Sequence, residues 1–316
     1  KKYYLYSLDH IYFLNILLLP FSILYLSINL IKKYFFSNKR NNTIPVIVVG
    51  NLTVGGTGKT SLVIWLCNYF SSRKYNVAVI SGGYKTTDPN KIQIVNKDSK
   101  ANEVGDEAIL IGKKTQSIVC KCKNRKLAYE FLVKNYKLDF IISDDGLTHY
   151  KLNRNLNIVI VKENKPFGNG LVLPAGPLRE LPSSINSYDN VIFNKSKKSN
   201  VPGFYYDIST LKSILNSSEL DIESLSGTSV HLVTAIANPD LLIKSLNRYN
   251  VDIISHIYPD HYLLNEEDFI FNDNLKTIMT EKDFVKCGDF NLENAYYLPT
   301  KIIVDNDIKI MLNNQI

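Results

Sequence analysis

Residues 44–70 read IPVIVVGNLTVGGTGKTSLVIWLCNYF, and this stretch decides the fold. Its first part, residues 46–49, is a short, β-branched apolar run that is typical of a buried parallel strand. A glycine-rich turn follows, and KTSLVIWLCNYF then continues with helical spacing. A strand, a glycine-rich turn, Lys-Thr and a helix in this order form a P-loop. The stretch therefore predicts a doubly wound α/β fold that binds the phosphates of a nucleotide.

The turn itself carries the chemistry of phosphate binding. Its glycines let backbone amides point at a phosphate chain, and the N-terminus of the helix adds a favourable dipole. Lys59 places a cation near the outer phosphates, and Thr60 offers a hydroxyl to Mg²⁺. The strict pattern has a glycine where this chain has Thr53, but GGTGKT stays specific in its strand-to-helix context. The predicted nucleotide-binding residues are Thr53, Val54, Gly55, Gly56, Thr57, Gly58, Lys59, Thr60 and Ser61.

Further apolar runs predict more strands of the same mostly parallel sheet, at residues 76–80, 139–143, 157–161 and 190–194. Asp144 and Asp145 follow the second of these runs, where the carboxyl end of a strand lies beside the phosphate crevice. Such carboxylates can bind Mg²⁺, although turn and N-cap aspartates are also common after strands. With a P-loop upstream, the metal role is favoured. Residues 194–197, NKSK, lack the Asp of a guanine-reading loop, so we expect ATP.

Composition sets the limits of what else the chain can be. Its 316 residues, 45% hydrophobic and 21% charged, indicate a globular protein with about two domains. The net charge of +7 hints at an anionic partner, but no basic block interleaved with aromatics supports nucleic-acid binding. Four scattered cysteines indicate reduced thiols, including the C-x-C pair Cys120 and Cys122, which alternation would place on one face of a strand.

The first forty residues contain a long run without charge, residues 11–31. As a helix it would measure roughly 31 Å, about the thickness of the hydrocarbon core of a bilayer. Pro20 would kink this helix, and four polar residues weaken the membrane signal, Asn15, Ser22, Ser27 and Asn29. The run predicts a membrane segment, either spanning or half-inserted, with the following residues on the cytoplasmic side. The alternative is a buried or interfacial helix packed on the body of the protein.

Seven motifs then occur in a fixed order along the chain: GNLTVGGTGKT (50–60), EVGDEAIL (103–110), SDDGLTHY (143–150), FGNGLVLPAGPLRE (167–180), AIANP (235–239), YPDHY (258–262) and TEKDFVK (280–286). Together with the N-terminal hydrophobic stretch they closely resemble the tetraacyldisaccharide 4'-kinase family, the lipid A 4'-kinases of Gram-negative bacteria. The resemblance runs nearly from end to end, and the ordered set is more specific than any motif besides the P-loop.

The resemblance implies transfer of the ATP γ-phosphate to the 4'-hydroxyl of a tetraacylated glucosamine disaccharide 1-phosphate, giving lipid IVA. It implies ATP and Mg²⁺ as cofactors, and an enzyme on the cytoplasmic face of the bacterial inner membrane, whose lipid it contacts. No obligatory protein partner is evident. The expected organisation is a membrane-anchoring helix over residues 1–36, a P-loop kinase domain over 37–225 and a smaller C-terminal α/β domain over 226–316, which closes the active-site cleft.

Residue roles follow from the matching motifs. In the family, the Asp of the GDE stretch is the proposed general base, here Asp106, and the His of the DH pair, here His261, assists it. Lys59 completes the catalytic set with Arg179, which could stabilise charge on the transferring phosphoryl group. Glu180 is a further metal ligand candidate beside Thr60, Asp144 and Asp145.

Each of these residues also has a plainer interpretation. Acidic residues at 106 and 107 could simply begin a helix, His261 could be a turn residue, and Arg179 with Glu180 could form a surface ion pair. Two departures from the family put local contacts in doubt: Gly82 stands where many members have Arg, and Thr148 where they usually have Gln. The rival functions are a membrane-associated P-loop ATPase acting as a regulatory switch and a nucleotide-binding scaffold without catalysis.

Overall fold

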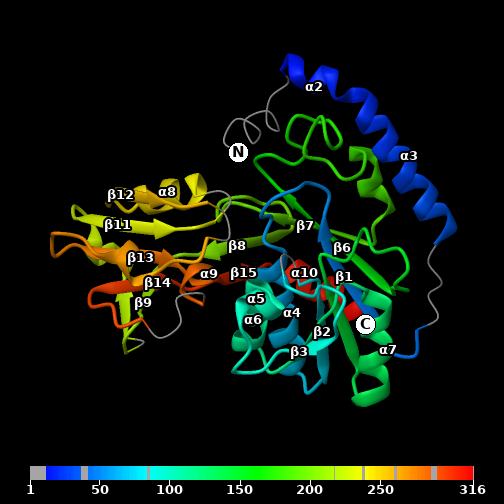
Figure 1. Cartoon of the computed structure of the whole chain (residues 1–316), viewed down its shortest axis with the longest axis horizontal. Coiled ribbons are helices and arrows are strands. Elements are labelled where there is room, and N and C mark those ends of the chain that lie inside the picture. The colour runs from blue at the N-terminus through cyan, green and yellow to red at the C-terminus, as the bar shows by residue number, and fades with distance from the viewer. Residues whose placement is uncertain are drawn as a thin grey trace. The chain divides into compact units, whose positions relative to one another are not determined.

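The computed structural model describes residues 12–36, 42–83, 86–216, 218–236, 239–259, 262–285 and 290–315. These residues form two compact units (Figure 1). The first unit extends to Tyr205 and resumes at Val304, and the second runs from Tyr206 to Ile303. The division therefore falls before the predicted boundary at residue 226, and the C-terminal residues return to the first unit.

A nine-stranded sheet forms the centre of the first unit, and two of its strands, β8 and β15, include residues on both sides of the division. Its strands are β1 (Val46–Asn51), β2 (Val77–Ser81), β3 (Gln93–Ile94), β4 (Ile118–Lys121), β5 (Phe140–Asp144), β6 (Leu156–Lys162), β7 (Asn190–Asn194), β8 (Gly203–Asp207) and β15 (Lys301–Val304). Their order in the sheet is β15-β8-β7-β6-β1-β5-β2-β4-β3. Neighbours from β8 to β4 pair in parallel, whereas β3 pairs with β4 in antiparallel fashion. All five strands predicted from the apolar runs are confirmed, as β1, β2, β5, β6 and β7.

The connections place helices on both faces of this sheet. The helices are α4 (Lys59–Ser71), α5 (Ala101–Val104), α6 (Asp106–Lys114), α7 (Arg125–Asn135), the 3₁₀ helix η1 (Pro182–Ser187) and α10 (Asn306–Gln315). The α4 crossover from β1 to β2 and the α7 crossover from β4 to β5 run in opposite directions along the sheet. Because such crossovers are right-handed, the two helices lie on opposite faces, as Figure 1 shows. After β5 the chain crosses to the other side of β1 and continues as β6, so the carboxyl end of β1 lies at a topological switch point.

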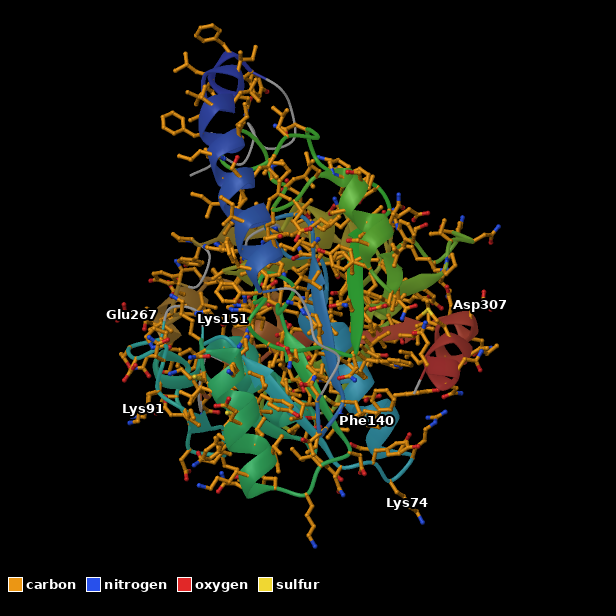
Figure 2. The ribbon with its side chains drawn as sticks, turned by 90° about the vertical axis from the view of Figure 1, so that its right-hand side faces the viewer. Lys74, Lys91, Phe140, Lys151, Glu267 and Asp307 are labelled. Carbon is orange, nitrogen blue, oxygen red and sulfur yellow. The ribbon has the colours of Figure 1, made fainter. Side chains whose placement is uncertain are left out.

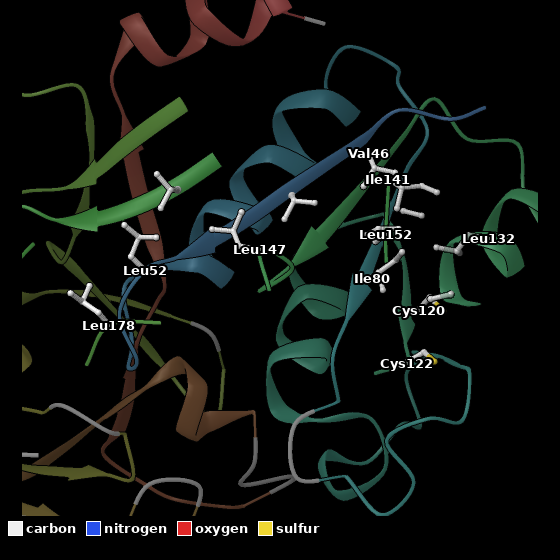
Figure 3. Close-up of a cluster of buried hydrophobic side chains, with 14 of the residues drawn as sticks. Val46, Leu52, Ile80, Cys120, Cys122, Leu132, Ile141, Leu147, Leu152 and Leu178 are labelled. Atoms are coloured by element: carbon white, nitrogen blue, oxygen red, sulfur yellow. The ribbon is translucent and has the colours of Figure 1, made fainter. Parts of the chain in front are cut away.

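One hydrophobic core of the first unit packs between the sheet and α7 (Figure 3). Alternate residues Val46 and Val48 reach it from β1, and Leu132 reaches it from α7. Fully burying one such side chain stabilises the fold by about 1.5–3 kcal/mol. Cys120 and Cys122 both belong to this cluster and carry free thiols, as their spacing predicted.

The N-terminal apolar run forms two helices, α2 (Phe13–Leu17) and α3 (Leu19–Phe35). The break at Leu18 lies just before Pro20, whose ring conflicts with the carbonyl four residues earlier in a continuous helix. Among the described residues, no helix is both long enough and apolar enough to cross a membrane. A membrane-spanning helix over residues 11–31 is therefore not supported, because the charge-free run is divided between two helices.

The second unit is a smaller α/β unit with a six-stranded sheet. Its elements are β9 (Thr210–Ser213), β10 (Glu219–Asp221), η2 (Ile222–Leu225), β11 (Ser229–Thr234), α8 (Asp240–Asn247), β12 (Asp252–Ile257), η3 (Glu266–Phe269), β13 (Lys276–Thr280), α9 (Glu281–Phe284) and β14 (Ala295–Leu298). The sheet order is β10-β9-β14-β13-β11-β12, parallel from β14 to β12.

The stretch EEDFIFNDN at residues 266–274 predicts a helix, but only its first four residues form the short 3₁₀ helix η3, because the polar Asn-Asp-Asn stretch at its end is unfavourable in a helix. The run TKIIVD predicts a strand, which is confirmed as β15. This strand lies at the edge of the nine-stranded sheet next to β8, although its residues up to Ile303 are grouped with the second unit. Its alternating burial fits an edge position, where one face stays exposed.

Candidate active site

The P-loop connects the end of β1 to the start of α4. Gly55 and Gly58 have φ angles of +105° and +95°, which L side chains rarely adopt. A Cβ atom added at Gly55 or Gly56 would have no heavy atom within 4 Å. The glycines thus line open space, and Nδ2 of Asn194 on β7 holds the turn by donating to the carbonyl of Thr57 at 3.0 Å. Turns of this shape, with open space at the glycines, accommodate phosphate groups.

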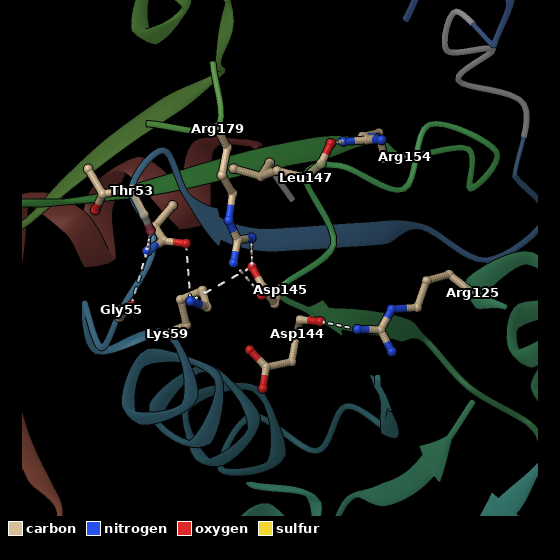
Figure 4. Close-up of polar contacts among 10 residues, drawn as sticks. Thr53, Gly55, Lys59, Arg125, Asp144, Asp145, Leu147, Arg154 and Arg179 are labelled. Atoms are coloured by element: carbon tan, nitrogen blue, oxygen red, sulfur yellow. Dashed lines mark hydrogen bonds and ion pairs between the residues drawn. The ribbon is translucent and has the colours of Figure 1, made fainter. Parts of the chain in front are cut away.

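Lys59 is held between an amide and a carboxylate. Its Nζ donates to Oδ1 of Asn51 at 3.1 Å and lies 3.7 Å from Oδ1 of Asp145. Arg179 binds the same carboxylate through both guanidinium arms, with Nη1 at 2.8 Å from Oδ1 and Nη2 at 3.3 Å from Oδ2 (Figure 4). Burial alone would raise the pKa of Asp145, but Lys59 and Arg179 outweigh it and lower the pKa. Asp145 therefore stays ionised between two cations.

Asp144, the last residue of β5, has a different environment. Its side chain is buried, and its Oδ1 has no hydrogen-bond partner within the part of the chain that the structure describes. Burial, followed by the negative charge of Glu107, raises the pKa of Asp144 to about 7, while Lys59 acts in the opposite direction. Two adjacent carboxyls with opposite pKa shifts at the end of one strand mark this edge of the sheet as a functional site.

The segment of residues 172–180 lies against the start of the P-loop. The amide of Val54 donates to the carbonyl of Pro177 at 2.8 Å, and the amide of Arg179 donates to the carbonyl of Leu52 at 2.7 Å. These backbone bonds fix the position from which the Arg179 side chain reaches Asp145. The end of the motif FGNGLVLPAGPLRE is therefore part of the phosphate site.

The N-terminal helices dock on the same segment through polar side chains. Nδ2 of Asn15 donates to the carbonyl of Ala175 at 2.6 Å. Oγ of Ser22 donates to the carbonyl of Val172 at 2.8 Å and accepts from the amide of Ala175 at 3.1 Å. Asn15 and Ser22 are both buried. Two of the polar residues that interrupt the apolar run therefore connect the N-terminal helices to the rest of the first unit by hydrogen bonds.

Asp106 begins α6, which packs against both α4 and β4. It is 9% exposed, and its Oδ1 accepts a hydrogen bond from the amide of Glu107 at 3.1 Å. Gly105 precedes it with a φ of +91°, so the turn into the helix requires a glycine. This position suits a helix-starting carboxylate and also suits a base beside the P-loop helix.

Glu180 is buried in a cluster on the side of α3. Its Oε1 accepts from the Tyr150 hydroxyl at 2.9 Å, and its Oε2 lies 3.5 Å from Nζ of Lys33. The Tyr188 hydroxyl also bonds to it; burial and then Glu180 raise the pKa values of both tyrosines. The described contacts of Glu180 are thus with two tyrosines and with Lys33 of α3, whereas Asp145 contacts Lys59 and Arg179 at the P-loop.

Comparison with known proteins shows the family of the chain. The LpxK family model, described as tetraacyldisaccharide-1-P 4'-kinase, matches residues 14–316. The chain belongs to the LpxK family. It is 37% identical to the tetraacyldisaccharide 4'-kinase of Coxiella burnetii (strain CbuK_Q154), over 94% of this chain and 91% of the relative. It is also 37% identical to that of Ruthia magnifica subsp. Calyptogena magnifica, over 93% and 95%. The fold matches a crystal structure of LpxK from Aquifex aeolicus in complex with ATP, with a TM-score of 0.76, 27% identity and coverage of 96% and 99%.

Within this LpxK-family chain, the structure brings part of the predicted site together. Lys59, Asp145 and Arg179 are in direct contact, and Asp144 adjoins them at the end of β5. Thr60 lies in the first turn of α4, directly after Lys59. Glu180 contacts α3 instead, and the described residues contain no group of three His, Cys, Asp or Glu side chains that could hold a metal. His261 lies outside the described residues.

Arg125 is a site residue that the sequence motifs missed. Its guanidinium is fully buried at the start of α7 and donates from Nη2 to the carbonyl of Asp144 at 2.6 Å, and from Nη1 to that of Cys122 at 3.2 Å. A Cβ added at Gly82 would lie 3.0 Å from the same Nη2. The guanidinium of Arg125 therefore occupies the space beside Gly82, the position at which the family resemblance led us to expect Arg. In the sequence, Arg125 stands in CKNRKLA, which matches no motif, so nothing there predicts that it reaches the site.

Glu107 and Asn51 were missed as well. Glu107 influences the pKa of Asp144 across the site, and Asn51 is the amide that holds Lys59. Glu107 lies in the motif EVGDEAIL beside the predicted base Asp106, and Asn51 lies in the motif GNLTVGGTGKT, which contains Lys59. A check of which side chains share a sheet edge would have found Asn51, because β1 ends with it.

Proposed function

We propose that the protein transfers the γ-phosphate of ATP to the 4'-hydroxyl of a tetraacyldisaccharide 1-phosphate and so forms lipid IVA for lipid A biosynthesis. The observation that carries the proposal is the P-loop of a chain that matches the LpxK family along nearly its whole length, with Lys59 and Arg179 on one carboxylate at the loop. The A. aeolicus relative was solved in complex with ATP, which supports ATP as the phosphoryl donor here.

The residues of this chain divide the work of phosphoryl transfer. The amides of the P-loop and the N-terminus of α4 bind the phosphates of ATP, and Lys59 neutralises their negative charge. Arg179, held by Asp145, directs its guanidinium at the charge that spreads over the transferring group. Because Asn51 and Asp145 already position Lys59, little reorganisation is needed when the nucleotide binds.

Mg²⁺ fits the residues present at this edge of the sheet. Asp144 offers a buried carboxylate oxygen that no described residue hydrogen-bonds, and Thr60 offers a hydroxyl in the first turn of α4. Mg²⁺ in proteins is usually held by one or two carboxylates, phosphates and water, so a third acidic ligand is not required. When bound, the ion would neutralise charge on the phosphates. Thr60, Asp144 and Asp145 would hold it, and Glu180 would support α3 instead.

Asp106 is proposed as the base that accepts the proton of the 4'-hydroxyl, with His261 as its assistant. Asp106 is largely buried at the start of a helix that packs on α4, so its carboxylate can be kept at a fixed place relative to the P-loop. A positioned carboxylate beside the acceptor hydroxyl contributes by general base catalysis.

Helices α2 and α3 are proposed to lie in the membrane interface without crossing the bilayer. Large apolar side chains along them are strongly exposed, among them Phe13 (78%), Phe21 (60%) and Phe35 (73%). Figure 2 shows the side chains of this helix projecting away from the rest of the first unit. An exposed apolar helical face with Lys32 and Lys33 in its last turn is typical of interfacial binding, which would bring the kinase to its lipid substrate on the inner membrane.

Transfer of labelled γ-phosphate from ATP tests the reaction. The assay uses Mg²⁺ and mixed micelles, with and without tetraacylated disaccharide 1-phosphate. We expect a labelled lipid that depends on the acceptor, and a loss of about 10²–10⁴-fold in Asp106→Asn, the range for a lost general base. Asp240→Asn is the matched control, since Asp240 begins α8 as Asp106 begins α6. Release of label only as inorganic phosphate, whatever the lipid, would replace the kinase with the switch ATPase.

A further inference from the structure

One arginine side chain bridges two strand ends at the carboxyl edge of the nine-stranded sheet. In this sheet, β2 lies between β4 and β5. The register of β2 with β5 runs to Ser143, and its register with β4 runs to Lys121. The next residues along the two outer strands are Asp144 and Cys122, whose carbonyls accept from Arg125 at 2.6 Å from Nη2 and 3.2 Å from Nη1. The guanidinium therefore joins β4 and β5 at the place where β2 has ended.

Gly82 makes room for this guanidinium. It follows Ser81, the last residue of β2. A Cβ atom added at Gly82 would lie 3.0 Å from Nη2 of Arg125 and 3.5 Å from both its Cζ and its Nη1. A side chain at position 82 would therefore press on the guanidinium. The backbone of Gly82 is not in the left-handed region, so an alanine at this position tests the space alone.

The guanidinium is also a buried cation, since Arg125 is only 3% exposed. Burial lowers the pKa of Arg125, and the carboxylates of Asp144 and Asp145 act in the opposite direction. Their negative charge helps to balance the guanidinium, which can therefore stay buried where it bonds to the backbone (Figure 4). The planar fork of an arginine has donors in fixed directions, so the single ammonium of a lysine would not replace both bonds.

The strand end that Arg125 holds carries both aspartates of the phosphate site. Asp144 is the last residue of β5, and Asp145 follows it directly. We propose that Arg125 is a positioning residue for the use of Mg²⁺: it fixes the backbone of Asp144, and with it the place of both carboxylates, in the space that Gly82 leaves free. The proposal rests on the proposed function, because that function requires the metal. Arg125 acts through the backbone of Asp144 and is not assigned a contact with the reacting groups.

Binding of ATP with and without the metal tests this role without using kinase activity. ATP is titrated into the full chain by calorimetry in the absence of acceptor lipid, once with excess Mg²⁺ and once with EDTA. The ratio of the two dissociation constants measures how much Mg²⁺ strengthens binding. Binding in EDTA depends on the amides of the P-loop and on Lys59, so it reports whether the first unit is folded. We expect the wild type to bind ATP more tightly with Mg²⁺ than with EDTA.

Two substitutions disturb the contact from its two sides and keep every charge of the site. Gly82→Ala presses on the guanidinium, and Arg125→Lys removes the bridge between the two carbonyls. Each should lower the ratio roughly tenfold to hundredfold, the range for a hydrogen bond to a charged group, and leave binding in EDTA unchanged. The double variant should lose no more than Arg125→Lys alone, because the contact at Gly82 is then already absent.

Matched controls come from the same unit. Gly112→Ala creates a comparably close contact, since its Cβ would lie 3.2 Å from Cγ1 of Val95. Lys126→Arg changes the next cation along α7, whose side chain is 61% exposed. Both variants should keep the wild-type ratio.

A wild-type ratio in both Gly82→Ala and Arg125→Lys would overturn the proposal, and so would losses that multiply in the double variant. If Arg125→Lys does not bind ATP in EDTA, its first unit is unfolded and Gly82→Ala decides the result. A wild type that binds ATP equally with and without Mg²⁺ would overturn the proposal together with the proposed metal ligands. A failure of the kinase reaction gives a different result, because a chain that binds Mg²⁺ with ATP but forms no labelled lipid would refute the transfer and leave the role of Arg125 supported.

Discussion

Replacing Asp144 with Asn should stabilise the protein without ligands and impair its use of Mg²⁺. Asp144 is buried, its Oδ1 has no described hydrogen-bond partner, and its pKa is raised from 3.8 to about 7, chiefly by burial and then by Glu107. An ionised carboxylate at this place is therefore unfavourable in the folded protein until a cation is bound. Asn keeps the size of the side chain and removes the charge.

The pKa shift gives the size and the sign of the effect. A rise from 3.8 to about 7 is about three units, or about 4 kcal/mol at high pH. The folded state holds the proton more tightly than the unfolded state, so stability is fully present below pH 3.8 and is lost as pH rises through about 7. Linkage over this window makes the advantage of Asp144→Asn about 2.5 kcal/mol larger at about pH 8 than at about pH 5.

Urea unfolding followed by the fluorescence of Trp65 measures this difference. Trp65 is the only tryptophan in the sequence, and it lies on α4 stacked on Tyr69 with 4.7 Å between ring centroids, so it reports the first unit. Asp145→Asn is the matched neighbour with the opposite sign, because the cations at Asp145 lower its pKa. Addition of Mg²⁺ and ATP should stabilise the wild type more than Asp144→Asn. Equal stability differences at the two pH values would refute the assignment of an abnormal pKa to Asp144.

Three further predictions concern the loop, the cation and the N-terminal helices. Arg179→Gln should lower kcat about 10²–10³-fold in the acceptor-dependent assay, because a donor to the developing charge is lost. Gly55→Ala should weaken ATP binding about tenfold through its positive φ, measured by fluorescence titration, while Gly227→Ala, with a similar φ and open surroundings in the second unit, should leave it unchanged. Asn15→Ala and Ser22→Ala should each speed hydrogen exchange of the α3 backbone by about tenfold, since each removes a buried hydrogen bond worth about 1 kcal/mol. Unchanged exchange in both variants would contradict the docking role of these side chains.

The parallel sheet could be predicted from the sequence because its strands are buried on both faces. Such strands appear as continuous apolar runs rich in β-branched residues, and β1, β2, β5 and β6 have this form. The shorter apolar run of β7 is partly exposed on one face. The edge strand β15 has the same composition, but its run of letters does not reveal which sheet it joins. β15 pairs with β8, and nearly a hundred residues separate the two strands in the sequence. No local sequence pattern predicts a pairing over that distance.

The candidate site was predictable where a short motif contains both the loop and the side chain. Lys59 and Thr60 are of this kind, and so is Asp144 with Asp145 at a strand end. Arg125 is different, because it reaches the site from α7 on the opposite face of the sheet and bonds to a carbonyl rather than to a charged group. Glu180 was predicted at the site from its motif but lies elsewhere: its neighbour Arg179 contacts Asp145, while the carboxylate of Glu180 contacts Lys33 of α3. Adjacent residues in an irregular segment can serve different surroundings, and only the backbone path decides between them.

The segment of residues 172–180 explains why an apolar N-terminal helix and a phosphate site belong to one unit. On one side its backbone bonds to the P-loop at Leu52 and Val54, and on the other its backbone bonds to Asn15 and Ser22. The same segment presents Arg179 to the phosphate site and Glu180 to Lys33 on α3. If α3 left its place, the segment would lose these polar partners and its backbone would need water in their stead. The N-terminal helices therefore support the arginine at the phosphate site as well as carrying an exposed apolar face.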